Sequence, residues 1–137
     1  MLMIRIVVLA AALAGASVVA APSAYADDGW VAAASSPSHE SSEMVWGVDQ
    51  RDAESRALAQ CAVLERADDC LLLASGPDCV AIAWDGDQPI NHAHGASGGG
   101  RAVVVQAAVA AAGPLANDVS ARCSWDPHPE PGMRLVA

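Results

Sequence analysis

The segment from Cys61 to Cys79, CAVLERADDCLLLASGPDC, constrains the fold most, because it contains three of the four cysteines and joins two similar halves of the chain. The sequence CVAIAW at 79–84 matches WVAAAS at 30–35 position by position, with Val80 aligned on Val31. Internal repetition of this kind sets the whole fold, since each copy has to bury its apolar face against another element. The sequence therefore predicts two units of the same kind.

The first unit, about residues 30–75, is predicted to contain a strand at 30–35, a polar loop at 36–43 and a strand at 44–48. Asp49 is expected to cap a helix from about 50 to 65, with Asp52 near its positive end. Apolar spacing predicts a buried helical stripe of Ala53, Ala57, Cys61 and Leu64. The strand expected at 70–74 is apolar on both faces, which predicts a central position in a sheet.

The second unit, about residues 79–125, repeats this order with strands at 79–84 and 90–94, a helix at 101–112 and a strand at 119–125. The turn Asp85-Gly86-Asp87 is expected to make a shorter loop than the first unit has, Ser97 is expected to cap the helix, and Gly113-Pro114 to end it. We therefore predict one α+β domain over 27–125, in which two tandem strand-strand-helix-strand repeats form antiparallel sheet packed with two helices. The proline-rich residues 126–137 are expected to be a disordered tail.

Residues 1–26 have the features of a secretory signal peptide. Arg5 precedes an apolar run, and Ala24-Tyr25-Ala26 resembles a cleavage site followed by Asp27. Cleavage is expected between Ala26 and Asp27. A membrane anchor is the alternative, but the apolar run is shorter than the roughly 20 residues that span a bilayer. We therefore expect a protein that is secreted or held in the cell envelope, without stable membrane insertion after cleavage.

The charge of the exported part limits the classes of partner that it can bind. Arg5 is the only charged residue of the leader, so six arginines face 16 acidic residues in the mature chain, a formal charge of −10. Such a surface repels nucleic-acid backbones and anionic membranes. A protein partner with a basic patch is compatible with it.

Four cysteines in a small exported domain predict two disulfides, with three possible pairings. Zinc is the competing interpretation, but none of the spacings is the tight pair typical of a structural zinc site. A short loop separates Cys61 at a helix end from Cys70 at a strand start, and Cys79 and Cys123 lie on strands expected to be neighbours. The predicted disulfides are therefore Cys61–Cys70 and Cys79–Cys123, whereas a Cys70–Cys79 bond would require a different strand order.

The order of WVAAASSPS, VWG, ALAQC, CLLLASGPDCVAIAW, GAS and ARCSW over residues 30–125 resembles the domain-of-unknown-function 4189 family, small exported proteins of mycobacteria and related actinomycetes. The spacing of Cys70 and Cys79 followed by VAIA is the most specific part. The chain departs from the family in its first strand, in the eight residues between Cys61 and Cys70, and in the run around Cys123. The resemblance implies export and disulfides for a divergent member, and it implies no enzymatic activity, cofactor or site residue.

His92 and His94 form the main candidate for a chemical site. With Asp85 or Asp87 they make the residue set of a two-histidine, one-carboxylate metal site. The alternative is two polar side chains on the wet face of an exposed strand, with aspartates that serve the turn. We expect no resident cofactor or metal.

Other candidate motifs are weaker. Ser97 in GASGG has the neighbours of a nucleophilic serine, but this chain is too short for the fold that the motif requires, so a helix cap is favoured. The glycines of GASGGGR could cradle a phosphate, yet they lack the lysine of a P-loop. Two pairs of acidic residues, Glu40 with Glu43 and Asp68 with Asp69, are expected to be solvated.

The four tryptophans are the only aromatic residues of the mature chain: Trp30, Trp46, Trp84 and Trp125. We expect at least two to fill the core. The alternative is that one or two are exposed anchors for a partner. The sequence thus predicts a small, monomeric, non-enzymatic protein that binds another protein outside the cytoplasm. The alternative is a small secreted hydrolase or metal-binding protein that uses His92 and His94.

Overall fold

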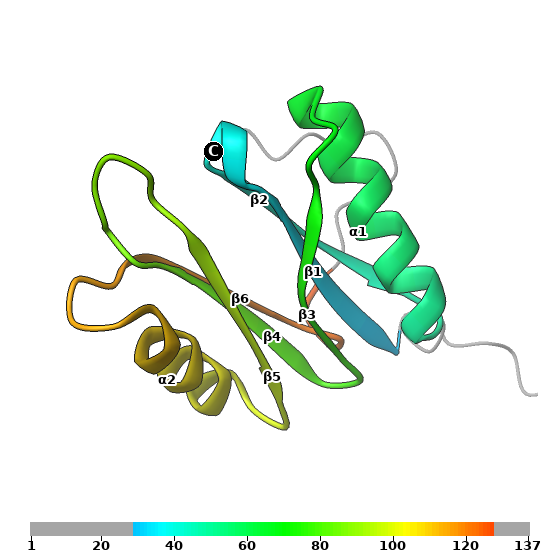
Figure 1. The fold of residues 1–137 in the computed structure, drawn as a ribbon. Coiled ribbons are helices and arrows are strands. Elements are labelled where there is room, and N and C mark those ends of the chain that lie inside the picture. Colours follow the sequence, from blue (N-terminus) through cyan, green and yellow to red (C-terminus); the bar gives the residue numbers. More distant parts are fainter. Residues whose placement is uncertain (1–28, 128–137) are drawn as a thin grey trace, which may run out of the picture.

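The computed structural model describes residues 29–127, so the predicted leader with its cleavage site after Ala26 lies outside the described residues, as do residues 128–137 of the predicted tail. The elements follow one another along the chain as shown in Figure 1. They are β1 (Trp30–Ser36), a 3-10 turn (Pro37–His39), β2 (Ser41–Gly47), α1 (Gln50–Glu65), β3 (Leu71–Gly76), β4 (Cys79–Trp84), β5 (Ala93–Gly98), α2 (Arg101–Ala112) and β6 (Asn117–Cys123).

The strands form two antiparallel sheets of three strands each, in the orders β2-β1-β3 and β5-β4-β6. The first strand of each unit is thus the central strand of its sheet. The two sheets lie face to face, and each carries its own helix on its outer face, so the layers run α1, sheet, sheet, α2 (Figure 1). The predicted α+β architecture of two strand-strand-helix-strand repeats is confirmed.

Successive side chains of a strand point to opposite faces of the sheet. Residues of each central strand therefore contribute alternately to the core under the helix and to the core between the sheets. In β1, Ala32 and Ala34 pack under α1, whereas Val31 and Ala33 pack in the layer between the sheets. Strand β4 repeats the scheme, with Ala81 under α2 and Val80 between the sheets. Every residue of β4 is buried, as expected for a strand covered on both faces.

Helix α1 begins and ends for identifiable local reasons. The Asp49 carboxylate accepts the N–H of Asp52 at 2.8 Å, which confirms the predicted cap. Ala53, Ala57 and Cys61 form the buried stripe. The prediction for Leu64 is wrong, since this residue is 54% exposed. Arg66 adopts the left-handed conformation that ends the helix, and the chain turns so that Ala67 takes the next buried position.

Strand β3 is an edge strand, so its predicted central position is wrong. It pairs with β1 alone, and Leu71 and Leu72 are exposed. The centre belongs to β1, whose small residues allow a helix and a second sheet to approach on its two faces. The register of β1 and β3 shifts between Ala33 and Ala34, and Leu73 at this shift packs between the sheets.

Strand β5 begins at Ala93 rather than at residue 90, and the loop before it is longer, not shorter, than the turn of the first unit. The predicted cap is also wrong, because Ser97 lies within β5 and Gly100 is the N-cap of α2. The small residues of this strand have a tertiary reason. A Cβ on Gly95 would lie 2.7 Å from the Cβ of Leu73, so β5 can approach β3 only where it has no side chain.

Strand pairing also gives β2 and β6 bounds that differ from the predicted ones. Strand β2 begins at Ser41, three residues earlier than predicted, because Ser41 pairs with Ser36 and the polar loop shrinks to a short turn. Strand β6 covers Asn117–Cys123 instead of 119–125. Asp126, at the start of the predicted tail, forms an ion pair with Arg101 and accepts the N–H of Cys123 at 2.8 Å.

Both disulfides join the predicted pairs. Cys61 of α1 is bonded to Cys70, the residue before β3. Cys79 of β4 is bonded to Cys123 of β6, directly opposite it in the sheet. No free cysteine occurs among residues 29–127. The first bond therefore ties a helix to its sheet, and the second ties two neighbouring strands together.

Candidate functional site

His92 and His94 both lie close to Asp85 at the end of β4. The Asp85 Oδ2 atom is 3.3 Å from His92 Nδ1 and 3.3 Å from His94 Nε2. Its Oδ1 atom accepts the backbone N–H groups of His92 at 3.0 Å and of Asp87 at 3.1 Å. The hydrogen bond from the His92 N–H lowers the pKa of Asp85 to about 2, with smaller contributions from the Asp87 N–H, the His94 side chain and the charge of His92.

This arrangement holds the loop between β4 and β5. Asp85 is buried, and both oxygens of its carboxylate contact groups of that loop. Asp87 contributes its backbone rather than its side chain. Across the described part of the chain, no group of three or more His, Cys, Asp or Glu side chains is placed to hold a metal ion. The predicted residues are thus brought together, but as a structural cluster.

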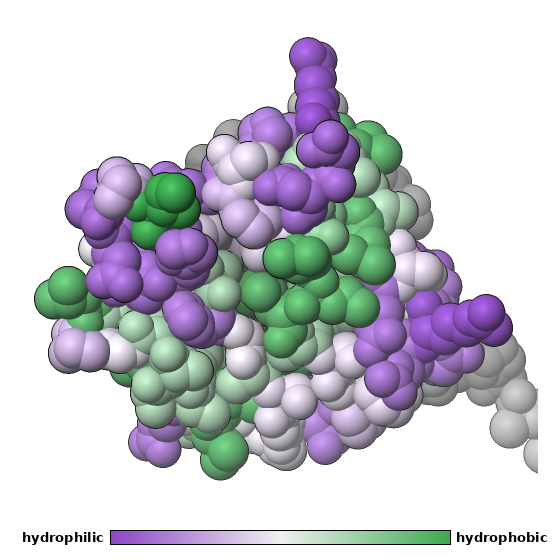
Figure 2. All heavy atoms as spheres, viewed as in Figure 1, coloured by the Kyte–Doolittle hydropathy of each residue, from purple (hydrophilic) through white to green (hydrophobic). Residues whose placement is uncertain are grey.

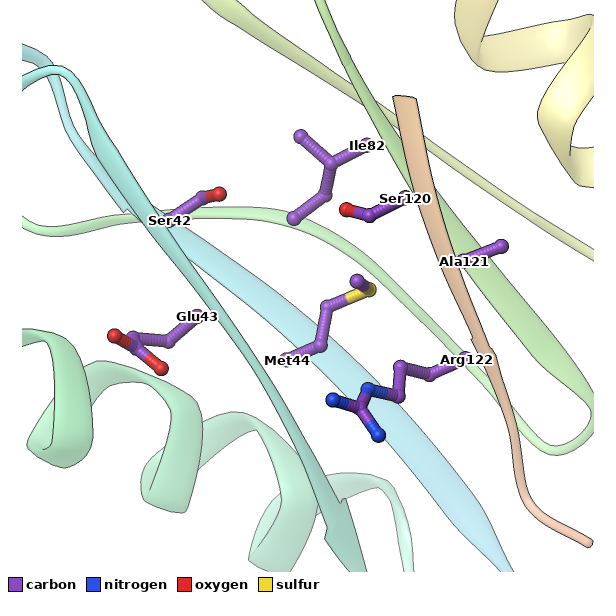
Figure 3. Close-up of a pocket in the computed structure, with 7 residues that line it drawn as sticks. All are labelled: Ser42, Glu43, Met44, Ile82, Ser120, Ala121 and Arg122. Atoms are coloured by element: carbon purple, nitrogen blue, oxygen red, sulfur yellow. The ribbon is translucent and has the colours of Figure 1, made fainter. Parts of the chain in front are cut away.

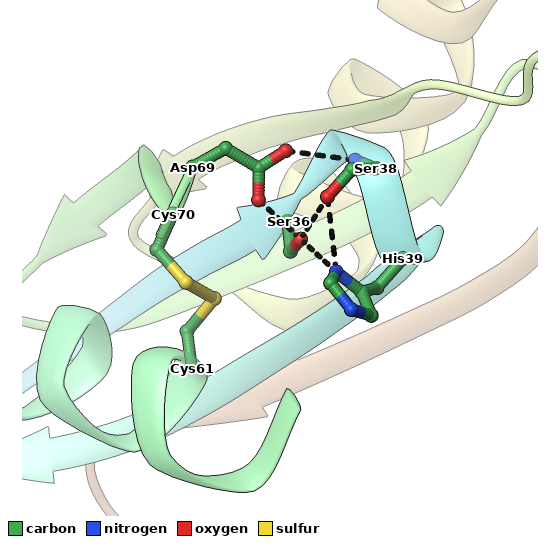
Figure 4. The surroundings of a disulfide bond; sticks show 6 residues. All are labelled: Ser36, Ser38, His39, Cys61, Asp69 and Cys70. Carbon is green, nitrogen blue, oxygen red and sulfur yellow. Dashed lines mark hydrogen bonds between the residues drawn. A yellow bond between two sulfur atoms is a disulfide. The ribbon is translucent and has the colours of Figure 1, made fainter. Parts of the chain in front are cut away.

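A second cluster joins the turn after β1 to the start of β3 (Figure 4). The Ser36 hydroxyl donates to Asp69 Oδ1 at 2.6 Å, and the Ser38 N–H donates to Asp69 Oδ2 at 2.8 Å. His39 Nδ1 lies 3.1 Å from Ser36 Oγ and 3.0 Å from Ser38 Oγ. The Ser36 hydroxyl, followed by the Ser38 N–H, lowers the pKa of Asp69 to about 2.

Serine, histidine and aspartate are the residue types of a hydrolytic triad, but their order differs here. In a triad the histidine lies between serine and aspartate and takes the serine proton. Ser36 instead gives its hydrogen to Asp69 and is fully buried. The cluster therefore fixes the turn against the residue that precedes Cys70. The sequence predicts a solvated Asp69 and gives no sign of this cluster, because a serine that becomes buried within a polar run has no local signal.

Three tryptophans contribute to packing and one is exposed. Trp84 is 7% exposed, and Trp30 packs against the core under α1. Trp46 packs between the sheets and donates its indole N–H to the carbonyl of Cys123 at 3.0 Å. Trp125 is 58% exposed in the turn after β6. The expectation that at least two tryptophans fill the core is confirmed.

Two exposed leucines lie at the start of the edge strand β3, one towards each face of the sheet, because neighbouring strand residues alternate. Leu71 is 57% exposed and Leu72 is 42% exposed. The Cys61–Cys70 bond ties this strand start to the last turns of α1, where Leu64 is also exposed. Figure 2 shows hydrophobic residues gathered over β3 in the middle of this face, with hydrophilic residues on either side. We call the edge of the sheet that carries Leu71 and Leu72 the leucine surface.

Strand β2, the other edge strand of the first sheet, borders a groove. Between β2 and β6 lies a cavity of about 310 Å³, and both strands are outer strands of their sheets. Figure 3 shows its lining residues: Ser42, Glu43, Met44, Ile82, Ser120, Ala121 and Arg122. The molecule therefore presents two distinct surfaces on the two edges of the first sheet, one apolar and one that contains an arginine.

No family model matches this chain, and searches of curated proteins and of solved structures also found no match. The resemblance based on the cysteine-containing segment stays a prediction. Neither α1 nor α2, the helices of the described residues, is long and apolar enough to cross a membrane.

Proposed function

We propose that this chain is an exported, non-enzymatic module that binds another protein outside the cytoplasm through the leucine surface. The observation that carries the proposal is the exposure of Leu71 and Leu72 on an edge strand. Large apolar side chains that gather on a surface are typical of interaction sites. An edge strand also offers unpaired backbone groups to a partner strand.

The surroundings of the leucine surface suit a partner with basic residues around an apolar contact. Glu65 is the last residue of α1, and Asp68, which is exposed, lies between α1 and β3 in the chain. The mature chain has a formal charge of −10, with six arginines against 16 acidic residues. Electrostatic attraction between such surfaces speeds association and weakens as salt rises.

The leucine surface is also held in place before binding. Cys70, the residue before Leu71, is bonded to Cys61, and Asp69 is held by Ser36 and Ser38. A surface that is ordered in the free protein loses less conformational entropy on binding. The two disulfides fit an oxidising compartment outside the cytoplasm.

Affinity capture with the mature protein, followed by quantitative mass spectrometry, tests the proposal in a comparison of variants. Leu71→Ser combined with Leu72→Ser is expected to abolish recovery of the partner. Val103→Ser is the matched control, because Val103 is 61% exposed on α2, and it is expected to leave recovery unchanged. Circular dichroism checks that each variant is folded.

Equal recovery with the leucine double variant contradicts the proposal. A dimer of this chain that the double variant loses, seen by size-exclusion chromatography, replaces the foreign partner with a second copy. A hydrolytic activity that is lost in His92→Ala or His94→Ala, with the fold intact, contradicts the non-enzymatic part and favours the alternative function.

A further inference from the structure

The groove between β2 and β6 is lined by both apolar and polar side chains, and the alternation of strand residues decides which of them face it. Ser42 and Met44 of β2 lie on the side of the sheet opposite Val45, which packs under α1. On β6, Ser120 and Arg122 lie opposite Cys123, which packs under α2. Ile82 of β4 is 1% exposed and lines the groove between these walls.

Arg122 is held in the groove on an aromatic platform. Its guanidinium lies over the ring of Trp46, 5.1 Å from the ring centroid. The indole N–H of Trp46 donates to the carbonyl of Cys123, which fixes the ring between the two sheets. Such a contact between a cation and an aromatic ring orients the guanidinium and leaves its N–H groups able to donate hydrogen bonds.

Arg122 belongs to none of the four ion pairs found among residues 29–127, although it is partly buried. Glu43 lines the same groove, but Figure 3 shows its carboxylate directed towards α1 and away from Arg122. Burial, together with the charge of Glu65, raises the pKa of Glu43. Burial opposes it, but hydrogen bonds from Arg101 and from the Cys123 N–H lower the pKa of Asp126, with a smaller contribution from the charge of Arg122, and Asp126 forms its ion pair with Arg101.

We propose that this groove binds a carboxylate attached to a short aliphatic group, as at the C-terminus of a peptide that ends in leucine. A guanidinium forms two parallel hydrogen bonds with a carboxylate. Met44 and Ile82 offer apolar contacts to the aliphatic group, and the hydroxyls of Ser42 and Ser120 offer hydrogen bonds. A cavity of about 310 Å³ is at the small end of ligand sites, so it accommodates a terminal residue rather than a long segment.

The site is independent of the proposed protein-binding function. The leucine surface belongs to β3 and the groove to β2, and these strands are the two opposite edges of one sheet. A variant of one surface is therefore expected to leave the other intact. The negative charge of the whole protein opposes anion binding, so the local contribution of Arg122 has to decide affinity.

Nuclear magnetic resonance titration of the ¹⁵N-labelled mature protein tests the proposal. The probes are acetyl-alanyl-leucine as the free acid, the same peptide as its C-terminal amide, and 4-methylpentanoate. The free-acid peptide is expected to shift the Trp46 indole N–H and the backbone N–H groups of Met44 and Ser120. The amide peptide is expected to leave them in place. Binding of 4-methylpentanoate as well as the peptide indicates small acids as ligands, and binding of the peptide acid alone indicates a peptide C-terminus.

Arg122→Gln is expected to weaken the apparent affinity for the acid peptide at least about tenfold, because a charged hydrogen-bond pair is lost. Arg122→Lys keeps the charge but loses the second parallel hydrogen bond, so intermediate affinity is expected. Arg51→Gln is the control, since it removes the same charge from the first turn of α1, outside the groove. A dispersed spectrum shows that each variant is folded. Equal shifts with acid and amide, no shifts with either, or unchanged affinity in Arg122→Gln overturns the proposal.

Discussion

Replacing Cys79 and Cys123 with alanine is expected to destabilise the protein more than replacing Cys61 and Cys70. The two bonds close loops of very different length, with sequence separations of 44 and 9. In the chain-entropy model, the longer loop contributes about 4 kcal/mol to the free energy of unfolding and the shorter loop about 2.5 kcal/mol. Cys79 and Cys123 are both fully buried, whereas in the other pair Cys61 is fully buried and Cys70 only partly, so removal of the sulfur atoms adds a larger packing cost at the Cys79–Cys123 bond.

Urea unfolding of the mature protein, followed by far-ultraviolet circular dichroism, measures these differences. The Cys79→Ala, Cys123→Ala variant is expected to unfold at the lower urea concentration, with a free energy of unfolding about 1.5 kcal/mol below that of the Cys61→Ala, Cys70→Ala variant. The wild type under reducing conditions is the control and is expected to be no more stable than either variant. If loss of the Cys61–Cys70 bond costs as much or more, loop length does not determine the stabilisation and the reasoning is wrong.

Two further predictions concern close packing and pH. Gly95→Ala is expected to lower the free energy of unfolding by about 1–3 kcal/mol in thermal melts, because the new methyl group meets the backbone and Cβ of Leu73 at 2.7–2.8 Å. Gly29→Ala, where the nearest atom is 3.9 Å away, is the control, and equal losses in both variants contradict the argument. The pKa of Asp85 is lowered from 3.8 to about 2 in the folded protein. The contribution of this carboxylate to the free energy of unfolding is therefore fully present above pH 3.8 and is lost as the pH falls towards 2. Acid unfolding of Asp85→Asn is therefore expected to depend less on pH in this interval, and identical profiles contradict the assignment.

The elements predicted well are those whose signals are local. The helices at 50–65 and 101–112 and the strand at 79–84 occur with the predicted bounds. Asp49 satisfies a free N–H at the start of α1, and Gly113 follows the last residue of α2. Each of these signals acts over a few residues, so it can be recognised without knowledge of the fold. The internal repeat predicts the order of helices and strands, and that order places the two cysteines of each disulfide close together.

The surfaces on which function is proposed depended on tertiary structure. Leu71 and Leu72 form an apolar run that suits a buried strand, and only the pairing of β1 with both neighbours places β3 at an edge. Gly95 resembles a turn residue in sequence, yet it lies in a strand because Leu73 leaves no room for a side chain. Nothing in the sequence around Arg122 predicts that this residue lies in a groove.

The amino-acid sequence by itself thus determined the order of helices and strands and the disulfide pairs, since these follow from local propensity, apolar periodicity and repetition. Tertiary structure decided which strands became edges, that Ser36 meets Asp69, and that Arg122 lies over Trp46 in a groove. The physical reason is distance along the chain. Such contacts join residues separated by tens of positions, so they depend on how two sheets pack and not on the residues next to them.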